Sequence, residues 1–309
     1  MKYIGRKLIS QILYHTHSEK YQNILMWPVA RRVLGEQYIE TVNIGDDIRM
    51  HLYSDMHDMA VKSLLFYSDR VHYAMEPITA RLFIKLAKHA SCIVAAGGHL
   101  GYYSLIAAKH NPLASIYTFE PVSKIYARLV ENAKLNNSNI HAEHKALSDT
   151  EGEVIMNVDD GQSSVLSGKK KVPQEKVRAT TMDAYFSRQK NWPNLILLDV
   201  EGYEATVLSG AKETLAHKPD LIMEINLHMI RGAYKGEIQL TQNLKNLGYS
   251  LYIIRDNYKH LSMLTTPMEV SVAPFRPGDS SLFTSTWANI FATMKTSAEL
   301  EKFGIQITD

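Results

Sequence analysis

Three acidic residues stand close together after an apolar run. The segment Leu195–Leu198 is apolar throughout, and Asp199, Glu201 and Glu204 follow it within six residues. Carboxylates are costly to bury without partners, so some of these three must face a cleft, a metal ion or water. A carboxylate in a cleft can act as a general base. A second interpretation of Asp199 is a capping role at the start of the next helix.

A glycine-rich turn follows another apolar run. Gly97, Gly98 and Gly101 come after Cys92–Ala96 and open a helical pattern over Leu100–Lys109. Glycine at a strand-to-helix turn lets the backbone approach a ligand closely, as nucleotide-binding loops require. The same spacing also fits a turn in which glycine serves packing alone.

Two further segments follow expected strands. Glu120 comes directly after Ser115–Phe119 and 19 residues after Gly101, which suits a carboxylate that accepts hydrogen bonds from a ribose diol. Because Glu120 and Pro121 also open a helix, the acid suits a helix N-terminus as well, and both roles can hold at once. The segment 145–149 would lie beside the base of a bound nucleoside.

Alternating strands and helices are expected to position these residues. The expected strands after residue 90 are Cys92–Ala96, Ser115–Phe119, Ile140–Ala146, Leu195–Leu198, Leu221–Ile225, Tyr249–Ile254 and Ser281–Ser285. The expected helices are Leu100–Lys109, Val122–Leu135, one that begins over Glu204–Leu208, and Ile238–Leu247. Apolar strands separated by helices predict a parallel sheet covered on both faces. Ligands of such sheets bind beyond the carboxyl ends of the strands, where the polar residues above would gather.

The first 90 residues have a different pattern. We expect helices within 1–37, 58–67 and 76–90, and two short strands, Tyr38–Val42 and Ile48–Leu52, around the turn 45–47. Apolar residues at 4, 8, 9, 12 and 13 share one helical face beside Lys2, Arg6 and Lys7. This pattern favours a helix docked on the body, and the alternative is a peripheral membrane contact through a basic amphipathic helix.

Composition sets limits on function. The chain has 309 residues, 45% of them hydrophobic and 21% charged, with a formal net charge of +2. That balance does not favour nucleic acid as a partner. No apolar run approaches the roughly 18–20 residues that span a bilayer, and a signal peptide is not expected. The single cysteine, Cys92, excludes an intrachain disulfide and favours a reducing compartment, so we expect a cytoplasmic protein.

The run from Ile93 to Ile225 resembles the FkbM family of S-adenosylmethionine-dependent methyltransferases. The matching pieces are GGHLGYYSLIAA, FEPVSKIYARLVENAKLN, ALSDTEGE, LLDVEGYEATVLSGA and PDLIMEIN, and MEPITARLF is similar to the lead-in of the family. The resemblance implies an α/β, Rossmann-like, seven-stranded class I methyltransferase sheet, mostly parallel with an antiparallel last strand. Residues 1–75 would then be a helical and hairpin extension, and residues 76–309 the methyltransferase domain.

The resemblance also implies a site. Family motif positions give cofactor-binding roles to Gly97, Gly98, His99, Gly101, Tyr102, Glu120, Pro121, Ala146, Ser148, Asp149 and Asp199, with Asp199 and Glu201 lining the reaction cleft. The cofactor is S-adenosylmethionine, and the acceptor is a hydroxyl of a glycan or similar small molecule. No metal is expected.

One motif departs from the family. The acid usually found two residues before the first glycine is Ala95 here, and His99 and Gly98 replace the usual asparagine and alanine. Glu76, His99 or Asp199 would have to compensate at the amino end of the cofactor. The alternative is a degenerate, non-catalytic binding protein with the same fold. A nicotinamide-dependent oxidoreductase fits the glycine turn and Glu120 but leaves the acids after residue 198 unexplained.

Methyl transfer to a hydroxyl needs alignment of the reacting atoms and a base for the proton. The candidates are Asp199, Glu224 and His228, with Asp199 preferred for its place at a strand end. A divalent cation held by Asp199, Glu201 and Glu224 is the alternative. We expect the acceptor to be recognised by the N-terminal region, the loop Lys169–Lys171 and the segment after Glu224.

Overall fold

The apolar runs after residue 90 form the strands of one central sheet. The computed structural model describes residues 2–15, 27–34, 39–53, 59–69, 71–158, 163–164, 173–226, 237–254, 269–275 and 287–308. The order of strands across the sheet is β15-β13-β12-β14-β11-β10-β3-β4-β5. Their bounds are β3 Cys92–Ala96, β4 Ser115–Phe119, β5 His141–Glu143, β10 Leu195–Leu198, β11 Asp220–Asn226, β12 Ser250–Ile254, β13 Ser271–Pro274, β14 Trp287–Thr293 and β15 Gln306–Ile307.

The directions of the strands confirm the expected fold class. Strands β5, β4, β3, β10 and β11 are parallel neighbours, and β14 runs antiparallel to both β11 and β12. The sheet is therefore a mostly parallel, Rossmann-like α/β sheet, as expected, in which β14, β13 and β15 run opposite to the other six strands. Two short strands, β13 and β15, extend the sheet at one edge beyond the seven strands expected.

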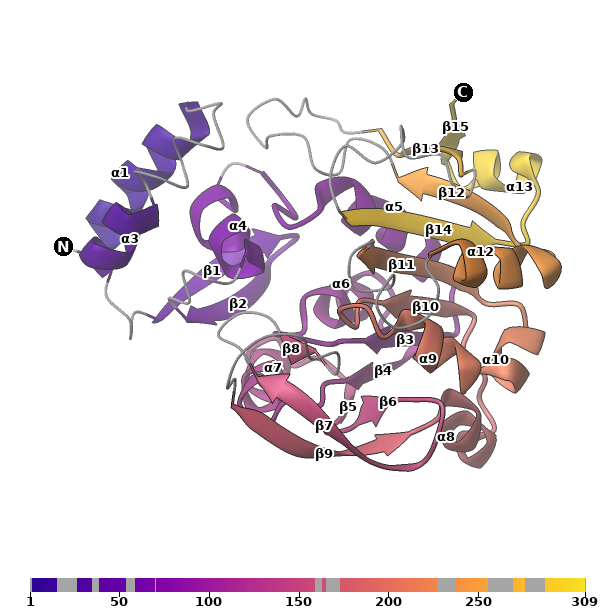
Figure 1. Ribbon diagram of the computed structural model, residues 1–309. Coiled ribbons are helices and arrows are strands. Elements are labelled where there is room, and N and C mark those ends of the chain that lie inside the picture. The colour runs from indigo at the N-terminus through magenta and orange to yellow at the C-terminus, as the bar shows by residue number, and fades with distance from the viewer. Residues whose placement is uncertain are drawn as a thin grey trace.

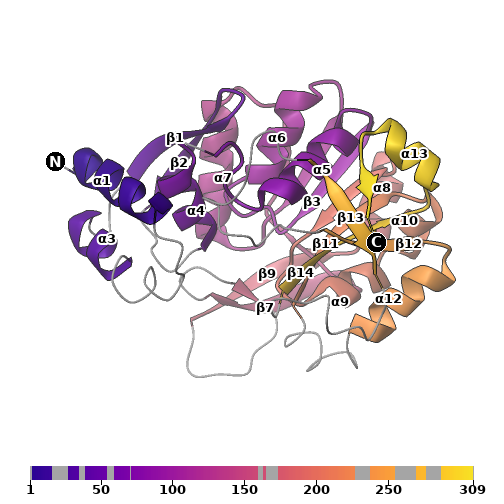
Figure 2. The same ribbon diagram turned by 90° about the horizontal axis from the view of Figure 1, so that it is seen from above.

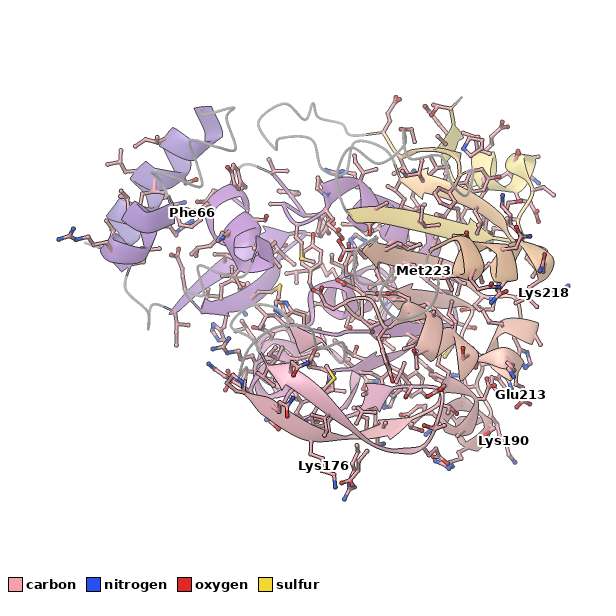
Figure 3. The ribbon with its side chains drawn as sticks, viewed as in Figure 1. Phe66, Lys176, Lys190, Glu213, Lys218 and Met223 are labelled. Carbon is pink, nitrogen blue, oxygen red and sulfur yellow. The ribbon has the colours of Figure 1, made fainter. Side chains whose placement is uncertain are left out.

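Helices cover both faces of the sheet (Figure 2). Helices α5 (Pro77–Ala87) and α6 (Tyr102–His110) lie on one face, while α8 (Met182–Gln189), α9 (Glu204–Ser209), α10 (Lys212–Ala216) and α12 (Glu237–Asn246) lie on the other. Side chains of β3 alternate between the two cores, with Ile93 on the first face and Val94 on the second. Met223 of β11, labelled in Figure 3, belongs to the second core. Helices α7 (Ser123–Leu135) and α13 (Ser297–Lys302) complete the described part of this region.

The expected strand Ile140–Ala146 is wrong in its second half. The chain leaves the central sheet after β5 and turns at Lys145, whose amide donates to the Glu143 carbonyl over 2.9 Å. Ala146–Leu147 then forms β6, which pairs with a second sheet of order β6-β9-β7-β8. The other strands of that sheet are β7 Gly152–Val158, β8 Ser163–Ser164 and β9 Gln174–Thr180. A separate small core of Ala146, Met156, Val177 and Ala179 accounts for the switch, because these residues pack together away from the central sheet.

The N-terminal region lies at one end of the molecule (Figure 1). It contains helices α1 (Lys2–His15), α3 (Trp27–Leu34) and α4 (Met59–Tyr67), and the antiparallel hairpin β1 (Ile39–Gly45) and β2 (Ile48–Tyr53). These elements confirm the expected helices and hairpin. One hydrophobic core contains residues of both the hairpin and α5, such as Leu52 and Phe83. The division at residue 75 therefore stays a prediction, since a shared core joins the two sides.

Some expectations concern residues outside the described ranges. The expected strand Ser281–Ser285, the loop Lys169–Lys171 and His228 lie there. Within the described ranges, no helix is both long and apolar enough to cross a membrane.

Asn132 of α7 fastens the hairpin to the central domain. Its side chain is fully buried, accepts from the His51 amide over 2.7 Å and donates to the Leu100 carbonyl over 3.0 Å. A buried amide that satisfies two backbone groups is costly to remove, because those groups lose their partner.

We therefore predict that Asn132→Ala lowers the free energy of unfolding by about 1–3 kcal/mol. Lys134→Ala, an exposed change on the same helix, should stay within about 0.5 kcal/mol of the native protein. Urea denaturation followed by circular dichroism measures both. Equal stability of the two variants would contradict this account of the hairpin.

Candidate functional site

The carboxyl ends of β3, β4, β10 and β11 bring the predicted residues to one edge of the sheet. The glycine turn follows β3, Glu120 follows β4, Asp199 follows β10, and Glu224 lies near the end of β11. Neighbouring parallel strands end at the same edge, so the order of these residues along the edge follows from the strand order β11-β10-β3-β4.

Gly97 lies against the backbone of the neighbouring strand end. It adopts a left-handed φ of 80°, and a Cβ added there would lie 1.7 Å from the carbonyl oxygen of Asp199. No side chain fits in that space. The amides of Gly97 and Gly98 both donate to the Phe119 carbonyl, over 3.1 and 2.9 Å. These two glycines therefore serve the close approach of three strand ends, and their amides already have partners.

The rest of the turn is fixed by packing and by one carboxylate. A Cβ at Gly98 would lie 2.3 Å from Thr118 Cγ2, whereas Gly101 has a left-handed φ of 90° and its nearest neighbour, Leu129, at 3.5 Å. His99 also has a positive φ, 46°, and its amide donates to Glu120 Oε2 over 2.9 Å. The glycine turn and the end of β4 are thus joined through Glu120.

Glu120 is buried, and both of its oxygens accept hydrogen bonds. Oε2 receives the His99 amide, and Oε1 receives the Val122 amide at the start of α7 over 2.9 Å. Burial raises the pKa of Glu120 to about 7, while the two amides and the nearby His99 oppose that rise. Each carboxylate oxygen has a second lone pair, so Glu120 keeps capacity for a ligand hydroxyl. Pro121, which follows it, is half-buried.

The segment expected beside a nucleoside base lies where the two sheets meet. Ala146 is in β6, and the Ser148 amide donates to the Thr180 carbonyl of β9 over 2.9 Å. The hydroxyl of Ser148 lies 3.2 Å from Asp149 Oδ1 and 3.3 Å from the hydroxyl of Tyr203. Tyr203 was not predicted as a site residue. Its place within the matching piece LLDVEGYEATVLSGA, four residues after Asp199, is the signal that could have found it.

Of the three acids after β10, Glu204 has a structural role. It is buried at the start of α9, and its Oε1 accepts from the amides of Val200 and Gly202 over 3.3 and 3.1 Å. It therefore closes a turn in which Glu201 and Gly202 both have positive φ. Burial raises the pKa of Glu204 to about 7.

Asp199 and Glu224 form a carboxyl pair. Burial raises the pKa of Glu224 well above its usual range, and the charges of Asp199 and Glu76 and a hydrogen bond with Asp199 raise it further. Two close carboxylates cannot both be ionised at low cost, so the pair holds a proton. Burial favours the protonated form at Glu224, and the proton is shared with Asp199. Across the reversed strand β14, Glu224 is paired in register with Asn289.

Glu76 joins this pair from the lead-in segment. It adopts a left-handed φ of 45° immediately before α5. Its Oε2 accepts from the Tyr103 hydroxyl over 2.8 Å, and its Oε1 from the Asn289 amide over 2.7 Å. Tyr103 and Asn289 were not predicted, because they are 27 and 213 residues from Glu76 in the chain. Ala95 is buried on β3, the strand that ends in the glycine turn.

Tyr102 contacts the lead-in segment before α5. It is buried at the start of α6, and its hydroxyl donates to the Met75 carbonyl over 2.8 Å. Within the described part of the chain, no three His, Cys, Asp or Glu residues are placed to hold a metal ion, and the described residues include Asp199, Glu201 and Glu224.

Known proteins resemble this fold and this sequence. Solved structures similar to the chain include a precorrin-6y C5,15-methyltransferase from Geobacter metallireducens, with 10% identity over 74% of this chain and 92% of that one and a TM-score of 0.39. Another is an O-methyltransferase from Bacillus cereus in complex with SAH, with 10% identity over 71% and 80% and a TM-score of 0.40. No curated protein sequence matches the chain significantly.

The fold is the α/β fold expected for a methyltransferase, with a mostly parallel central sheet covered by helices. The sequence matches the methyltransferase FkbM domain over residues 59–251. The chain therefore belongs to the FkbM methyltransferase family, as the sequence motifs predict, and S-adenosylmethionine is the cofactor of that family.

The two left-handed glycines of the turn allow a matched comparison. Gly101→Ala meets only backbone strain, because its Cβ would have ordinary contacts, and should cost about 1–2 kcal/mol of stability. Gly97→Ala must also displace the Asp199 backbone, and we predict a loss of more than about 4 kcal/mol. Chemical denaturation of both variants measures this difference. Similar losses in the two variants would show that the close contact between the ends of β3 and β10 does not determine the stability of the turn.

Proposed function

We propose that this protein transfers a methyl group from S-adenosylmethionine to a hydroxyl of a glycan or similar small molecule. One observation carries the proposal: Glu120, Asp199 and Glu224 lie at the ends of neighbouring strands, in a chain whose family is that of FkbM methyltransferases. The residues fit the cofactor, since a tight turn, in which Gly97 and Gly98 have no room for a side chain, lies between a buried acid and a carboxyl pair.

In this proposal the cofactor lies along the edge of the sheet. Glu120 accepts the ribose hydroxyls with its remaining lone pairs. Ala146, Ser148 and Asp149 border the adenine. The turn Gly97–Gly101 lets the backbone approach the methionine part closely. The amides of Gly97 and Gly98 already donate to the Phe119 carbonyl, so these two residues shape the site and do not donate hydrogen bonds to the cofactor.

Glu76 takes the place of the acid that Ala95 lacks. Its carboxylate is held by neutral donors from α6 and β14, so its direction is fixed before a ligand binds. The amino group of the cofactor is a cation, and a fixed carboxylate is a suitable acceptor for it. The charge of Glu76 also raises the pKa of Glu224. Glu76 is therefore close to the carboxyl pair, as the assignment of Glu76 to the cofactor site requires.

The reaction needs alignment and a base. The cofactor supplies a methyl group on a positively charged sulfur. Asp199 would take the proton of the acceptor hydroxyl, whose oxygen would receive the methyl group as the thioether sulfur leaves. Glu224, which shares a proton with Asp199, would keep Asp199 oriented. His228, which lies outside the described residues, stays a candidate base. The cytoplasmic location of the protein also stays a prediction.

The alternative is a non-catalytic binding protein with this fold. Ala95 favours it, since the motif acid is absent. Both functions require the cofactor site, and only the first requires a base.

We predict that the protein binds S-adenosylhomocysteine in calorimetry and that Glu76→Gln weakens this binding about ten- to hundredfold, the loss of one charged hydrogen bond. Binding of methylthioadenosine, which lacks the amino acid part, should change less than about twofold. Glu153→Gln, an exposed acid of the second sheet, is the control. If the native protein binds neither compound, the proposed function is wrong. If both compounds lose affinity equally in Glu76→Gln, only the assignment of Glu76 is wrong.

Asp199→Asn tests catalysis. We predict a loss of about 10²- to 10⁴-fold in the transfer of a labelled methyl group to acceptors in a cell extract. The affinity for S-adenosylhomocysteine should fall less than about tenfold, because the amide keeps the shape of the side chain. Unchanged transfer would exclude Asp199 as the base. Cofactor binding by the native protein without any transfer would favour the non-catalytic alternative.

A further inference from the structure

Two helices at the N-terminal end of the molecule carry exposed aliphatic side chains. On α1, Leu8 is 57% and Ile12 is 44% exposed, and on α3, Val29 is 45% and Val33 is 40% exposed. These four residues are called the N-terminal ridge here. Large aliphatic residues exposed singly are ordinary, but an apolar group gathered on one face indicates an interaction surface.

The N-terminal ridge is continuous across the two helices. Leu8 and Ile12 are four residues apart, as are Val29 and Val33, so each pair lies on one helical face. The helices touch at Gly5, one turn before Leu8, where an added Cβ would lie 2.6 Å from Val33 Cγ1. The apolar face of α1 therefore continues onto α3.

The opposite faces of both helices are packed on the body. Ile9, Ala30 and Leu34 are buried in the core that also contains residues of α4 and the hairpin. Arg6 is buried on α1 and bonds to the Leu65 carbonyl over 2.6 Å, to Glu40 over 2.7 Å and to Asp69 over 3.0 Å. Because these contacts fix α1, the N-terminal ridge faces outward from a docked helix, at the end of the molecule away from the central sheet (Figures 1 and 2).

The charge of the two helices is one-sided. They contain five of the 34 Lys and Arg residues of the chain, at positions 2, 6, 7, 31 and 32, and neither helix contains an Asp or Glu. Glu40 and Asp69 balance Arg6 and Lys7. Arg32 is exposed beside Val29 and Val33. An aliphatic helical face with an exposed arginine at its border fits the surface of an anionic bilayer.

A second copy of the chain fits this surface less well. A symmetric dimer would bury Arg32 of both copies in one interface, to which neither helix contributes an Asp or Glu as a partner. A stable protein interface also needs about 20–30 residues a side, many more than the four of the N-terminal ridge. Insertion of a few aliphatic side chains below the headgroups needs no such area.

We propose that the N-terminal ridge docks this protein on an anionic membrane surface, with Leu8, Ile12, Val29 and Val33 below the headgroups and Arg32 at the phosphates. This docking needs neither the cofactor nor the acceptor, so it stands apart from the methyltransferase activity.

Co-sedimentation with vesicles tests the proposal. The full chain should sediment with vesicles rich in phosphatidylglycerol and should stay in solution with vesicles of phosphatidylcholine alone. The double variant Leu8→Glu/Ile12→Glu should lose at least about tenfold in partitioning, and Arg32→Glu should lose severalfold. Leu113→Glu/Leu247→Glu, which changes two other exposed leucines by the same charge, is the matched control and should bind as the native chain does.

Three results would overturn the proposal. The native chain could fail to sediment with anionic vesicles. The double variant could bind as well as the control, while circular dichroism shows that both are folded. Alternatively, light scattering could show that the native chain and the control variant are dimers and that the double variant is a monomer. A second copy of the chain would then be the partner that binds the N-terminal ridge.

Discussion

The closeness of Gly97 to the carbonyl of Asp199 is the constraint on which the site depends. The end of β3 can turn toward α6 only because no side chain lies between it and the end of β10. The same approach brings the Gly97 and Gly98 amides to the last carbonyl of β4, so the ends of β3, β4 and β10 are in direct backbone contact. Glu120, Asp199 and the turn at Glu204 directly follow these strand ends, and the backbone contacts therefore determine how they are placed relative to one another.

The five acidic residues at this end of the sheet have two different kinds of partner. Glu120 and Glu204 are buried; both oxygens of Glu120 and one oxygen of Glu204 accept hydrogen bonds from backbone amides. Asp199 and Glu224 share a proton, and Glu76 is held in place by a hydroxyl and an amide. Glu120 and Glu204 thus stabilise turns, and in the proposed function Glu120 also keeps capacity for a ligand. Asp199 and Glu76, in contrast, lie close enough to Glu224 to raise its pKa. A cluster of this kind is costly in the protein alone, and a cation bound among the three would lower that cost.

The sequence carries most of the fold and part of the site. Strands β3, β4 and β10 were predicted with their bounds, because each is a mainly apolar run that is followed directly by glycine or an acid. The strand 140–146 was mispredicted, since its second half packs on residues 30 positions later, beyond the reach of a local pattern. The roles of Tyr103 and Asn289 were invisible for the same reason: only the folded sheet brings β14 beside the start of α5. Glu204 was read as one of three equivalent acids, and burial alone separates it from Asp199.

Glu120 holds the glycine turn through the His99 amide, and this has an evolutionary consequence. A descendant that gave up methyl transfer would still need Glu120, Gly97 and Glu204 in order to fold. Selection for a stable chain would preserve these residues long after catalysis was lost. Their presence in a relative therefore indicates the fold, whereas the loss of Asp199 or Glu224, which close no such turn, would indicate the loss of the proposed catalysis.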